Sequence, residues 1–467
     1  MSTTPLHFWT LLELSEALRT GKVSPVEATQ AQLDRIAATE PKYHSYVTVL
    51  AEHALAAARV AEAEIGRGFW RGPLHGVPIA VKDLCYTSYA PTSGGMAIYA
   101  DFVPPYSATV VDRLERAGAI ILGKLKMTEG AYAAHHPSVV SPLNPWNANH
   151  WVGSSSSGSG SATASGQCYG SLGSDTGGSI RFPSMCCGIT GLKPTWGRVS
   201  RYGVFALSDS LDHIGPMTRT AADAAAMLGA IAGADPNDPT AAQVPVPDYL
   251  ATINGGVSGL RIGWDEHFAT YDAGDDVKTA LAEAARVLVG LGARLVPIKF
   301  PDPEAVLKAW FPFCAVEVAI AHKATFPARA DDYGPSLRGL IESGHAVTGL
   351  GLGEALLTRQ TFNGELAKVM QDVDVLLLPA YKDLPPTLEA MARFGDDDAS
   401  VRSLLRYTAP FDHSRHPTIT MKGGVSASGL PAAIQLVGQH FAEDVLLRAG
   451  HAFQRATDWH TRHPPGA

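Results

Sequence analysis

Two short stretches combine glycine with serine in a way that suits nucleophilic catalysis. The first covers residues 153–161 and the second covers residues 173–181. In the second, Gly177 and Gly178 directly precede Ser179, so consecutive backbone N–H groups can turn towards one point beside a serine hydroxyl. A serine hydroxyl is a weak nucleophile until a base removes its proton. The pattern therefore indicates acyl transfer, with Ser179 as the candidate nucleophile.

The residues alone leave other interpretations of both stretches open. Residues 153–161 are also typical of a flexible linker. Their glycines have the spacing of a phosphate-binding loop, although Ser159 stands where that loop requires lysine. The second stretch also suits a glycine-rich turn with a solvated serine. Arg181 breaks the G-x-S-x-G context of many serine hydrolases, so no standard motif decides between these interpretations.

A lysine that follows a short apolar stretch is the candidate base. Residues 75–81 predict a buried strand entered by a turn, and Lys82 and Asp83 follow at its end. Lysine accepts a proton only when it is neutral, and burial of its ammonium group favours the neutral form. Without further evidence, an exposed Lys82–Asp83 ion pair is the commoner arrangement.

The elements that must position these residues alternate between helix and strand. Hydrophobic periodicity and capping signals predict helices at 11–19, from Ser24 onwards with a capping box, and at 51–65, 107–117 and 276–291. Strands are predicted at 119–122, 260–264, 294–298 and 432–437, with a helix–strand pair at 362–378. Residues 300–410 otherwise look irregular and are expected to supply pocket walls. The pattern predicts an α/β fold, with a sheet covered by helices on both faces.

Composition excludes several classes of function. The net charge is −8 and no basic run occurs, which argues against a nucleic-acid partner. The N-terminus lacks the pattern of a signal peptide, and the longest apolar stretches are too short to span a membrane. The five cysteines fit no zinc motif, and His135 and His136 are adjacent and cannot share one helical face as ligands. We expect buried reduced thiols in a cytoplasmic protein.

Several long motifs resemble the amidase signature family. They stand in the order of that family and cover most of the chain, with core motifs between 75 and 220 and the weakest similarity between 300 and 410. The motifs are residues 76–83, the Gly/Ser stretch, 175–184, 187–195, 214–220, 429–431, 435–438 and 458–460. The resemblance implies one amidase signature domain over residues 1–467, with a central mixed sheet covered by helices on both faces.

The resemblance also implies a Ser–cis-Ser–Lys triad. Ser179 is the nucleophile, Lys82 is the base, and Ser155, after a cis peptide bond, relays the proton between them. The oxyanion hole consists of the N–H groups of Thr176, Gly177, Gly178 and Ser179. An acyl-enzyme forms on Ser179, and water then releases the acid.

Further expectations concern the surroundings of the triad. Ala131 and Tyr132 should lie near the substrate, and residues 310–313 are either an aromatic wall or ordinary core packing. Asp175 and Arg181 should hold the nucleophile turn. Neither the residues nor the resemblance implies a metal or an organic cofactor. Departures from the family pattern bear on substrate choice, and they fall at Lys126, Ser154, Asp412 and Arg415.

Few charged residues are candidates for the pocket, which favours a small neutral or aromatic substrate. We expect an amidohydrolase that cleaves the C–N bond of an amide, anilide or carbamate (urethane), acting as a monomer or homodimer. Urethanase, aryl acylamidase, urea or esterase activity stays open. Two alternatives remain: the glutaminase subunit of a tRNA-dependent amidotransferase, which would need a partner protein, and a non-catalytic binding protein.

Overall fold

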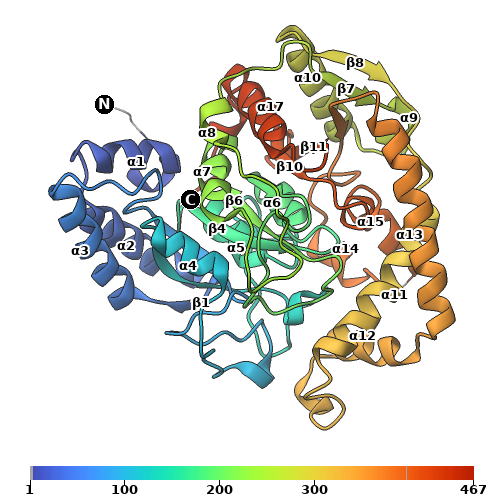
Figure 1. Ribbon diagram of the computed structural model, residues 1–467, viewed down its shortest axis with the longest axis horizontal. Helices are drawn as coiled ribbons and strands as arrows, with labels where there is room; N and C mark the ends of the chain where they lie inside the picture. The colour runs from blue at the N-terminus through green and yellow to red at the C-terminus, as the bar shows by residue number, and fades with distance from the viewer. Residues whose placement is uncertain (1–3, 396, 467) are drawn as a thin grey trace.

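A computed structural model describes residues 4–395 and 397–466, and an eleven-stranded mixed sheet runs through it (Figure 1). The strand order is β1-β3-β2-β4-β6-β5-β10-β11-β9-β7-β8. Neighbouring strands are parallel at β3-β2-β4 and at β9-β7-β8, and antiparallel elsewhere. The bounds are β1 (Tyr46–Val49), β2 (Pro78–Lys82), β3 (Ile120–Leu125), β4 (Gly170–Asp175), β5 (Thr190–Lys193), β6 (His213–Thr218), β7 (Arg261–Trp264), β8 (Arg294–Pro297), β9 (Val375–Leu378), β10 (Thr418–Val425) and β11 (Pro431–Gly438).

Helices cover both faces of this sheet, so the predicted fold class is confirmed. In Figure 1 the N-terminal helices α1–α3 form one end of the molecule, and α11–α13 form the other. The bounds are α1 (Leu11–Arg19), α2 (Pro25–Tyr43), α3 (Ala51–Gly66), α4 (Thr109–Arg116), α5 (Ser157–Ala164), α6 (Arg181–Cys187), α7 (Ala221–Ile231), α8 (Tyr249–Thr252), α9 (Glu266–Thr270), α10 (Asp275–Gly290), α11 (Glu304–Ala321), α12 (Pro335–Ala346), α13 (Gly349–Met370), α14 (Leu388–Ala392), α15 (Asp398–Leu405), α16 (Ala409–His413) and α17 (Glu443–Ala456).

The strands at the centre of the sheet carry the site and are buried along their whole length. Every residue of β2, β3 and β4 is buried, whereas β8 at the sheet edge is mostly exposed. A strand that is covered on both faces needs apolar or fully paired side chains at every position. The polar residues at the ends of β2 and β4 must therefore find partners inside the protein.

Most of the helices predicted from the sequence are confirmed. Helix α1 has the predicted bounds, and Ser24 and Glu27 form the predicted capping box at the start of α2. The predicted side-chain cap of the helix at 107–117 is wrong, because Ala108 precedes α4 and offers no cap. The irregular character predicted for 300–410 is also wrong, because α11–α15 fill most of that region.

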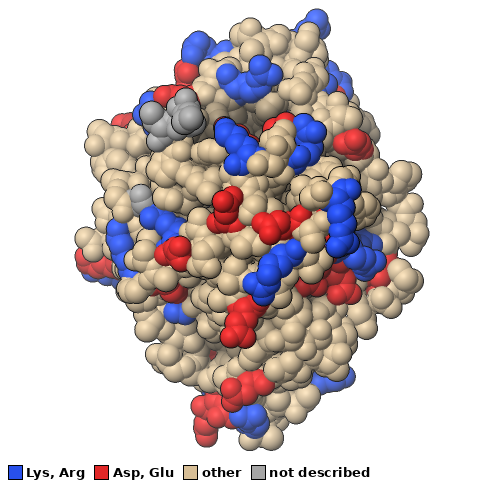
Figure 2. Space-filling view, turned by 90° about the vertical axis from the view of Figure 1, so that its left-hand side faces the viewer, with Lys and Arg blue, Asp and Glu red and all other residues tan. Residues whose placement is uncertain are grey.

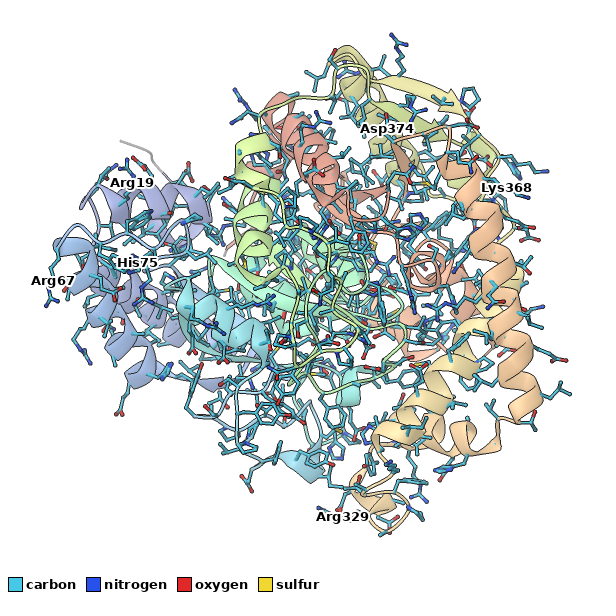
Figure 3. The ribbon with its side chains drawn as sticks, viewed as in Figure 1. Arg19, Arg67, His75, Arg329, Lys368 and Asp374 are labelled. Carbon is cyan, nitrogen blue, oxygen red and sulfur yellow. The ribbon has the colours of Figure 1, made fainter. Side chains whose placement is uncertain are left out.

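Charged groups of both signs lie on the periphery. Figure 3 places Arg19, Arg67, Arg329 and Lys368 at the outer edge of the fold. On the face that carries the N-terminal helices, Lys and Arg are interspersed with Asp and Glu (Figure 2). None of the helices within residues 4–395 and 397–466 is both long enough and apolar enough to cross a membrane.

Candidate active site

Lys82 ends β2 inside the protein, in a cage of three serine hydroxyls. Its Nζ atom lies 2.6 Å from Ser155 Oγ, 2.9 Å from Ser156 Oγ and 2.7 Å from Ser174 Oγ. The side chain is fully buried. The alternative of an exposed Lys82–Asp83 ion pair is therefore wrong, and Asp83 instead pairs with Lys124, at 3.3 Å between Oδ1 and Nζ.

Burial makes this lysine a base at neutral pH. Loss of hydration lowers the pKa of Lys82 to about 7, although the charges of Cys85, Asp175 and Asp212 oppose the shift. A neutral amine has one lone pair and two N–H groups. The three hydroxyls match this one acceptor and these two donors, because one hydroxyl can donate to Nζ while the two others accept from it.

The Gly/Ser stretch that supplies two of these hydroxyls is a packed element of the core. The Ser154–Ser155 peptide bond is cis, and every residue of α5 is buried. A Cβ atom on Gly158 would lie 2.4 Å from the carbonyl oxygen of Ser45, so only glycine fits there. The stretch is therefore neither a flexible linker nor a phosphate-binding loop.

The nucleophile turn follows β4 and is organised by Asp175. This carboxylate accepts hydrogen bonds from the backbone N–H groups of Gly178 at 2.7 Å and Ile180 at 2.9 Å. Arg181 binds it with two side-chain bonds, at 3.0 Å from Nε and 2.6 Å from the second nitrogen. Asp175 and Arg181 thus hold the turn, as expected.

A second carboxylate, which departs from the family pattern, completes this network. The guanidinium group of Arg181 also donates to Asp412 at 2.7 Å and to the carbonyl oxygen of Thr408 at 2.7 Å. All of these side chains are fully buried. Burial raises the pKa of Asp412 well above its usual range, against the opposing effect of Arg181. The turn is therefore anchored to the segment that leads into α16.

The structure assembles the Lys82–Ser155 half of the predicted triad. Ser179 lies beside it, because the N–H of Ser156 donates to the carbonyl oxygen of Ser179 at 3.4 Å. No hydrogen bond joins the Ser155 and Ser179 hydroxyls, both of which lie in the described part of the chain. Ser179 is partly exposed, whereas Lys82 and Ser155 are fully buried. Catalytic hydrogen bonds often close only in the complex with substrate, so the relay to Ser179 stays a prediction.

The backbone of the turn does not offer every predicted oxyanion donor. The N–H of Gly178 points at Asp175 and is not free for a substrate. The N–H groups of Thr176, Gly177 and Ser179 have no partner among the described residues. The position of Asp175, three residues before Gly178, is the sequence signal that could have revealed this difference.

Ser179 opens into a cavity of about 190 Å³. Ala131 and Tyr132 line it as predicted, and Ala131 adopts a left-handed backbone with φ of 63°. Thr128 holds this loop, because its N–H donates to the carbonyl oxygen of Ser155 at 3.1 Å. The other lining residues are Ala133, Ser154, Thr176, Gly177, Phe182, Leu207, Trp310, Ser336, Phe394, Gly395, Val401, Leu404 and Leu405. None of these described lining residues is charged at neutral pH.

The region between 300 and 410 contributes much of this wall, as predicted, but the individual residues were not predictable. Of residues 310–313, some belong to an aromatic cavity wall and others to ordinary core packing, the two interpretations that the sequence left open. Trp310 lines the cavity, Phe313 is buried in the core, and Phe311 is 43% exposed. Phe394 and Gly395, together with Val401, Leu404 and Leu405 of α15, form one side of the cavity. Nothing in the sequence indicates which face of the short helix α15 turns inwards.

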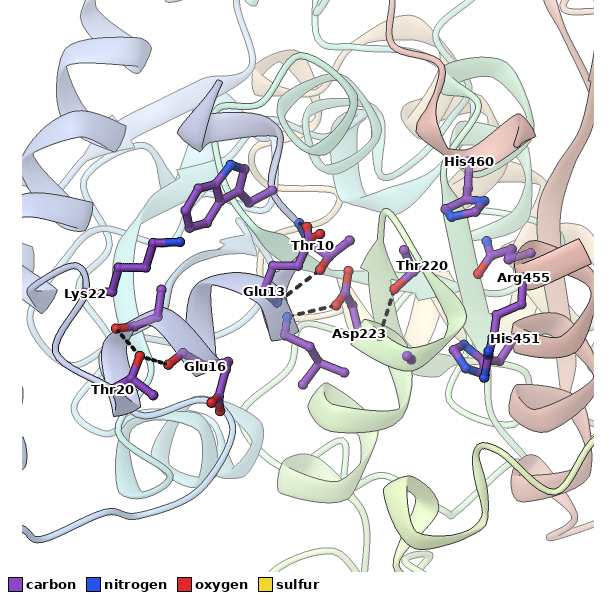
Figure 4. A pocket seen from close by; sticks show the side chains of 15 residues that line it. Thr10, Glu13, Glu16, Thr20, Lys22, Thr220, Asp223, His451, Arg455 and His460 are labelled. Atoms are coloured by element: carbon purple, nitrogen blue, oxygen red, sulfur yellow. Dashed lines mark hydrogen bonds between the residues drawn. The ribbon is translucent and has the colours of Figure 1, made fainter. Parts of the chain in front are cut away.

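A larger cavity of about 630 Å³ lies elsewhere, between α1 and α17 (Figure 4). Charged and titratable side chains line it, among them Glu13, Asp223, His451 and Arg455. It contains no member of the predicted triad. Across residues 4–395 and 397–466, no group of three or more His, Cys, Asp or Glu side chains is placed to hold a metal ion.

Comparisons with known proteins agree with this geometry. The family description "Amidase" matches residues 27–447. A Mycobacterium tuberculosis protein named "Putative amidase AmiD" is 47% identical over 456 residues, covering 97% of this chain and 95% of its own. A glutamyl-tRNA(Gln) amidotransferase subunit from Chloroflexus aggregans is 38% identical, with 99% of each chain covered. The solved structure of a peptide amidase from Stenotrophomonas maltophilia superposes with a TM-score of 0.84, at 28% identity and with 99% of each chain covered. The buried Lys82–Ser155 pair, the neighbouring nucleophile turn and these likenesses together show that the chain belongs to the amidase signature family of hydrolases.

Proposed function

We propose that this amidohydrolase cleaves the C–N bond of a small neutral or aromatic amide, anilide or carbamate. The observation that carries the proposal is the cavity at Ser179. Its described wall is apolar and aromatic apart from a few hydroxyl groups, and it carries no charge. A charged substrate would lose its hydration there without gaining an ion pair, whereas a neutral aromatic group would be stabilised by burial.

In the proposed reaction, neutral Lys82 draws the proton of Ser179 through the hydroxyl of Ser155. The Ser179 oxygen attacks the substrate carbonyl carbon, and the N–H groups of Gly177 and Ser179 stabilise the negative oxygen. The relay then returns the proton to the leaving nitrogen, the C–N bond breaks, and an acyl-enzyme remains. Water then attacks the acyl carbon and gives its proton to the same relay, the relay returns that proton to the Ser179 oxygen as the Ser179–acyl bond breaks, and the product leaves as a carboxylic acid or, from a carbamate, as a carbonic acid monoester.

A glutaminase is the second candidate, favoured by the 38% identity to the Chloroflexus aggregans amidotransferase subunit. Free glutamine carries an ammonium and a carboxylate group, and each needs an opposite charge or several hydrogen bonds when it is desolvated. The described wall of the cavity supplies hydroxyls but no charged side chain. The described part of the wall therefore favours neutral amides over glutamine.

A substrate panel tests the proposal. Acetanilides, aryl carbamates, aliphatic amides and glutamine are compared at equal concentration with the wild type, with Ser179→Ala and with Ser336→Ala. Ser336 is the matched control, because it is another cavity serine outside the relay. We expect turnover of neutral aromatic substrates that is lost in Ser179→Ala and retained in Ser336→Ala.

Covalent labelling gives an independent measurement. A sulfonyl fluoride should label Ser179, and mass spectrometry of the digested protein identifies the site. Labelling without turnover of any neutral amide would reject the substrate class. A protein that is neither labelled nor active would reject the enzyme assignment and support a binding protein.

A further inference from the structure

We infer that Trp310 is a positioning residue that orients the oxyanion hole through a hydrogen bond to the backbone of the nucleophile turn. The inference deepens the proposed function and rests on it. The indole Nε1–H of Trp310 donates to the carbonyl oxygen of Thr176 at 2.8 Å. This bond is buried, and Trp310 is only 7% exposed.

The geometry of the peptide group connects this bond to catalysis. A trans peptide unit is planar, and its C=O and N–H point in opposite directions. Fixing the carbonyl oxygen of Thr176 on Trp310 therefore directs the N–H of Gly177 the other way. That N–H has no partner among the described residues, and Thr176, Gly177 and Ser179 all line the cavity.

The next two peptide units of the turn are fixed in the same manner. Thr408 Oγ1 donates to the carbonyl oxygen of Gly177 at 2.6 Å, which directs the N–H of Gly178 to Asp175. The N–H of Phe182 donates to the carbonyl oxygen of Gly178 at 2.7 Å. The N–H of Ser179 then points away from that bond and has no partner among the described residues. Three donors thus fix three successive peptide planes. Of the N–H groups in these planes, those of Gly177 and Ser179 remain free to bind an oxyanion.

The indole ring also explains why residue 177 is glycine. A Cβ atom at this position would lie 3.0 Å from two carbons of the Trp310 ring and 3.1 Å from its nitrogen. The ring therefore rests directly on the backbone that it orients. Trp310 belongs to α11, outside the motifs that define the family in this sequence, so the resemblance does not assign it this role.

Each donor of an oxyanion hole contributes about 10²–10³ in kcat when removed outright. Loss of the Trp310 hydrogen bond frees the Gly177 N–H to rotate without deleting it. We therefore expect Trp310→Phe to lower kcat by about 10- to 100-fold with KM within about threefold. The phenyl ring keeps most of the apolar wall, which limits the effect on substrate binding.

Three further variants separate orientation from packing. Thr408→Val removes the hydroxyl at nearly constant volume and should lower kcat, whereas Thr408→Ser keeps the donor and should retain most of it. Phe313→Leu alters a buried aromatic residue one turn along α11 that makes no bond to the nucleophile turn, and kcat should change by less than about threefold. Circular dichroism and thermal unfolding confirm that each variant is folded.

The affinity for an aryl trifluoromethyl ketone distinguishes a misoriented oxyanion hole from a packing defect. A packing defect would weaken binding of this ketone and of its unreactive parent ketone alike. This probe forms a tetrahedral adduct with an oxyanion, so Trp310→Phe should weaken it by the same factor as kcat, while binding of the unreactive parent ketone changes little. A loss confined to KM, or an equal loss in Phe313→Leu, would overturn the inference while leaving the proposed function intact. Absence of wild-type turnover and of Ser179 labelling would overturn both.

Discussion

The acid limb of the pH–rate profile should report the deprotonation of Lys82. With a pKa of about 7, about half of the molecules carry the neutral amine at pH 7, and about one in a hundred does at pH 5. An exposed lysine would be neutral in only about one molecule in 3,000 at pH 7. We expect kcat/KM for a neutral anilide to rise about tenfold per pH unit below pH 6 and to level off above about pH 8.

Ser174→Ala should move this limb in a defined direction. The ammonium form of Lys82 donates to three serine oxygens, whereas the neutral amine donates to only two. A hydrogen bond from a charged group is stronger than a neutral one by about 1 kcal/mol. Removing the Ser174 acceptor therefore destabilises the charged form and should shift the acid limb to lower pH by about 0.5–1 unit.

Lys422→Met is the matched control for this shift. Burial lowers the pKa of Lys422 to about 7 as well, but this residue lies on β10 against the ring of Trp146, outside the serine cage. The limb should be unchanged in this variant. The role of Lys82 would be refuted if the midpoint of the acid limb shifted in Lys422→Met but not in Ser174→Ala. It would also be refuted if the wild-type midpoint lay near pH 10.

Three other outcomes follow from the buried charges and the cavity. Lys82→Met should abolish turnover yet raise the free energy of unfolding by a few kcal/mol at pH 6, measured by urea unfolding. The sign follows from a folded-state pKa below the unfolded value: the unfolded chain binds more protons between about pH 7 and 10.5, so wild-type stability rises across that window and is lowest below it. Arg181→Met should cost about 3–5 kcal/mol of stability, because it leaves the Asp175 carboxylate buried without its cation; an unchanged urea midpoint would contradict this. Leu404→Asp should lower kcat/KM for neutral anilides at least about tenfold, because it places a charge in the cavity wall. An unchanged kcat/KM in steady-state kinetics would contradict the binding of substrate in this cavity.

The parts of the fold that local rules govern were predictable from the sequence. The bounds of α1 and the capping box of α2 follow from side chains within one turn of each other. The helix–strand pair predicted at 362–378 matches the end of α13 and β9, whereas the other helices between 300 and 410 were missed because tertiary contacts decide them. Pro312 lies inside α11, and the first turns of α13 contain Gly349, Gly351 and Gly353, so both segments carry residues that disfavour a helix.

The candidate site divides in the same way. Motif resemblance led to Lys82, Ser155 and Ser179, and the structure brings the first two into contact. The Trp310 bond to Thr176 joins residues that are 134 positions apart, and spacing carries no information about such a contact. The peptide orientation at Gly178, by contrast, follows from the local bond to Asp175 three residues before it, which the sequence could have suggested.

One side of the cavity, made by Phe394, Gly395 and α15, is separate from the catalytic residues. Its described residues supply Phe394, Val401, Leu404 and Leu405 to the wall but make no hydrogen bond to the serine cage or to the nucleophile turn. A chimaera that receives this stretch from a relative would therefore inherit the donor's substrate preference while keeping its own proton relay. Substrate preference and catalysis thus depend on different segments of the chain. The fold should therefore accept an exchanged cavity wall without a change in its catalytic residues.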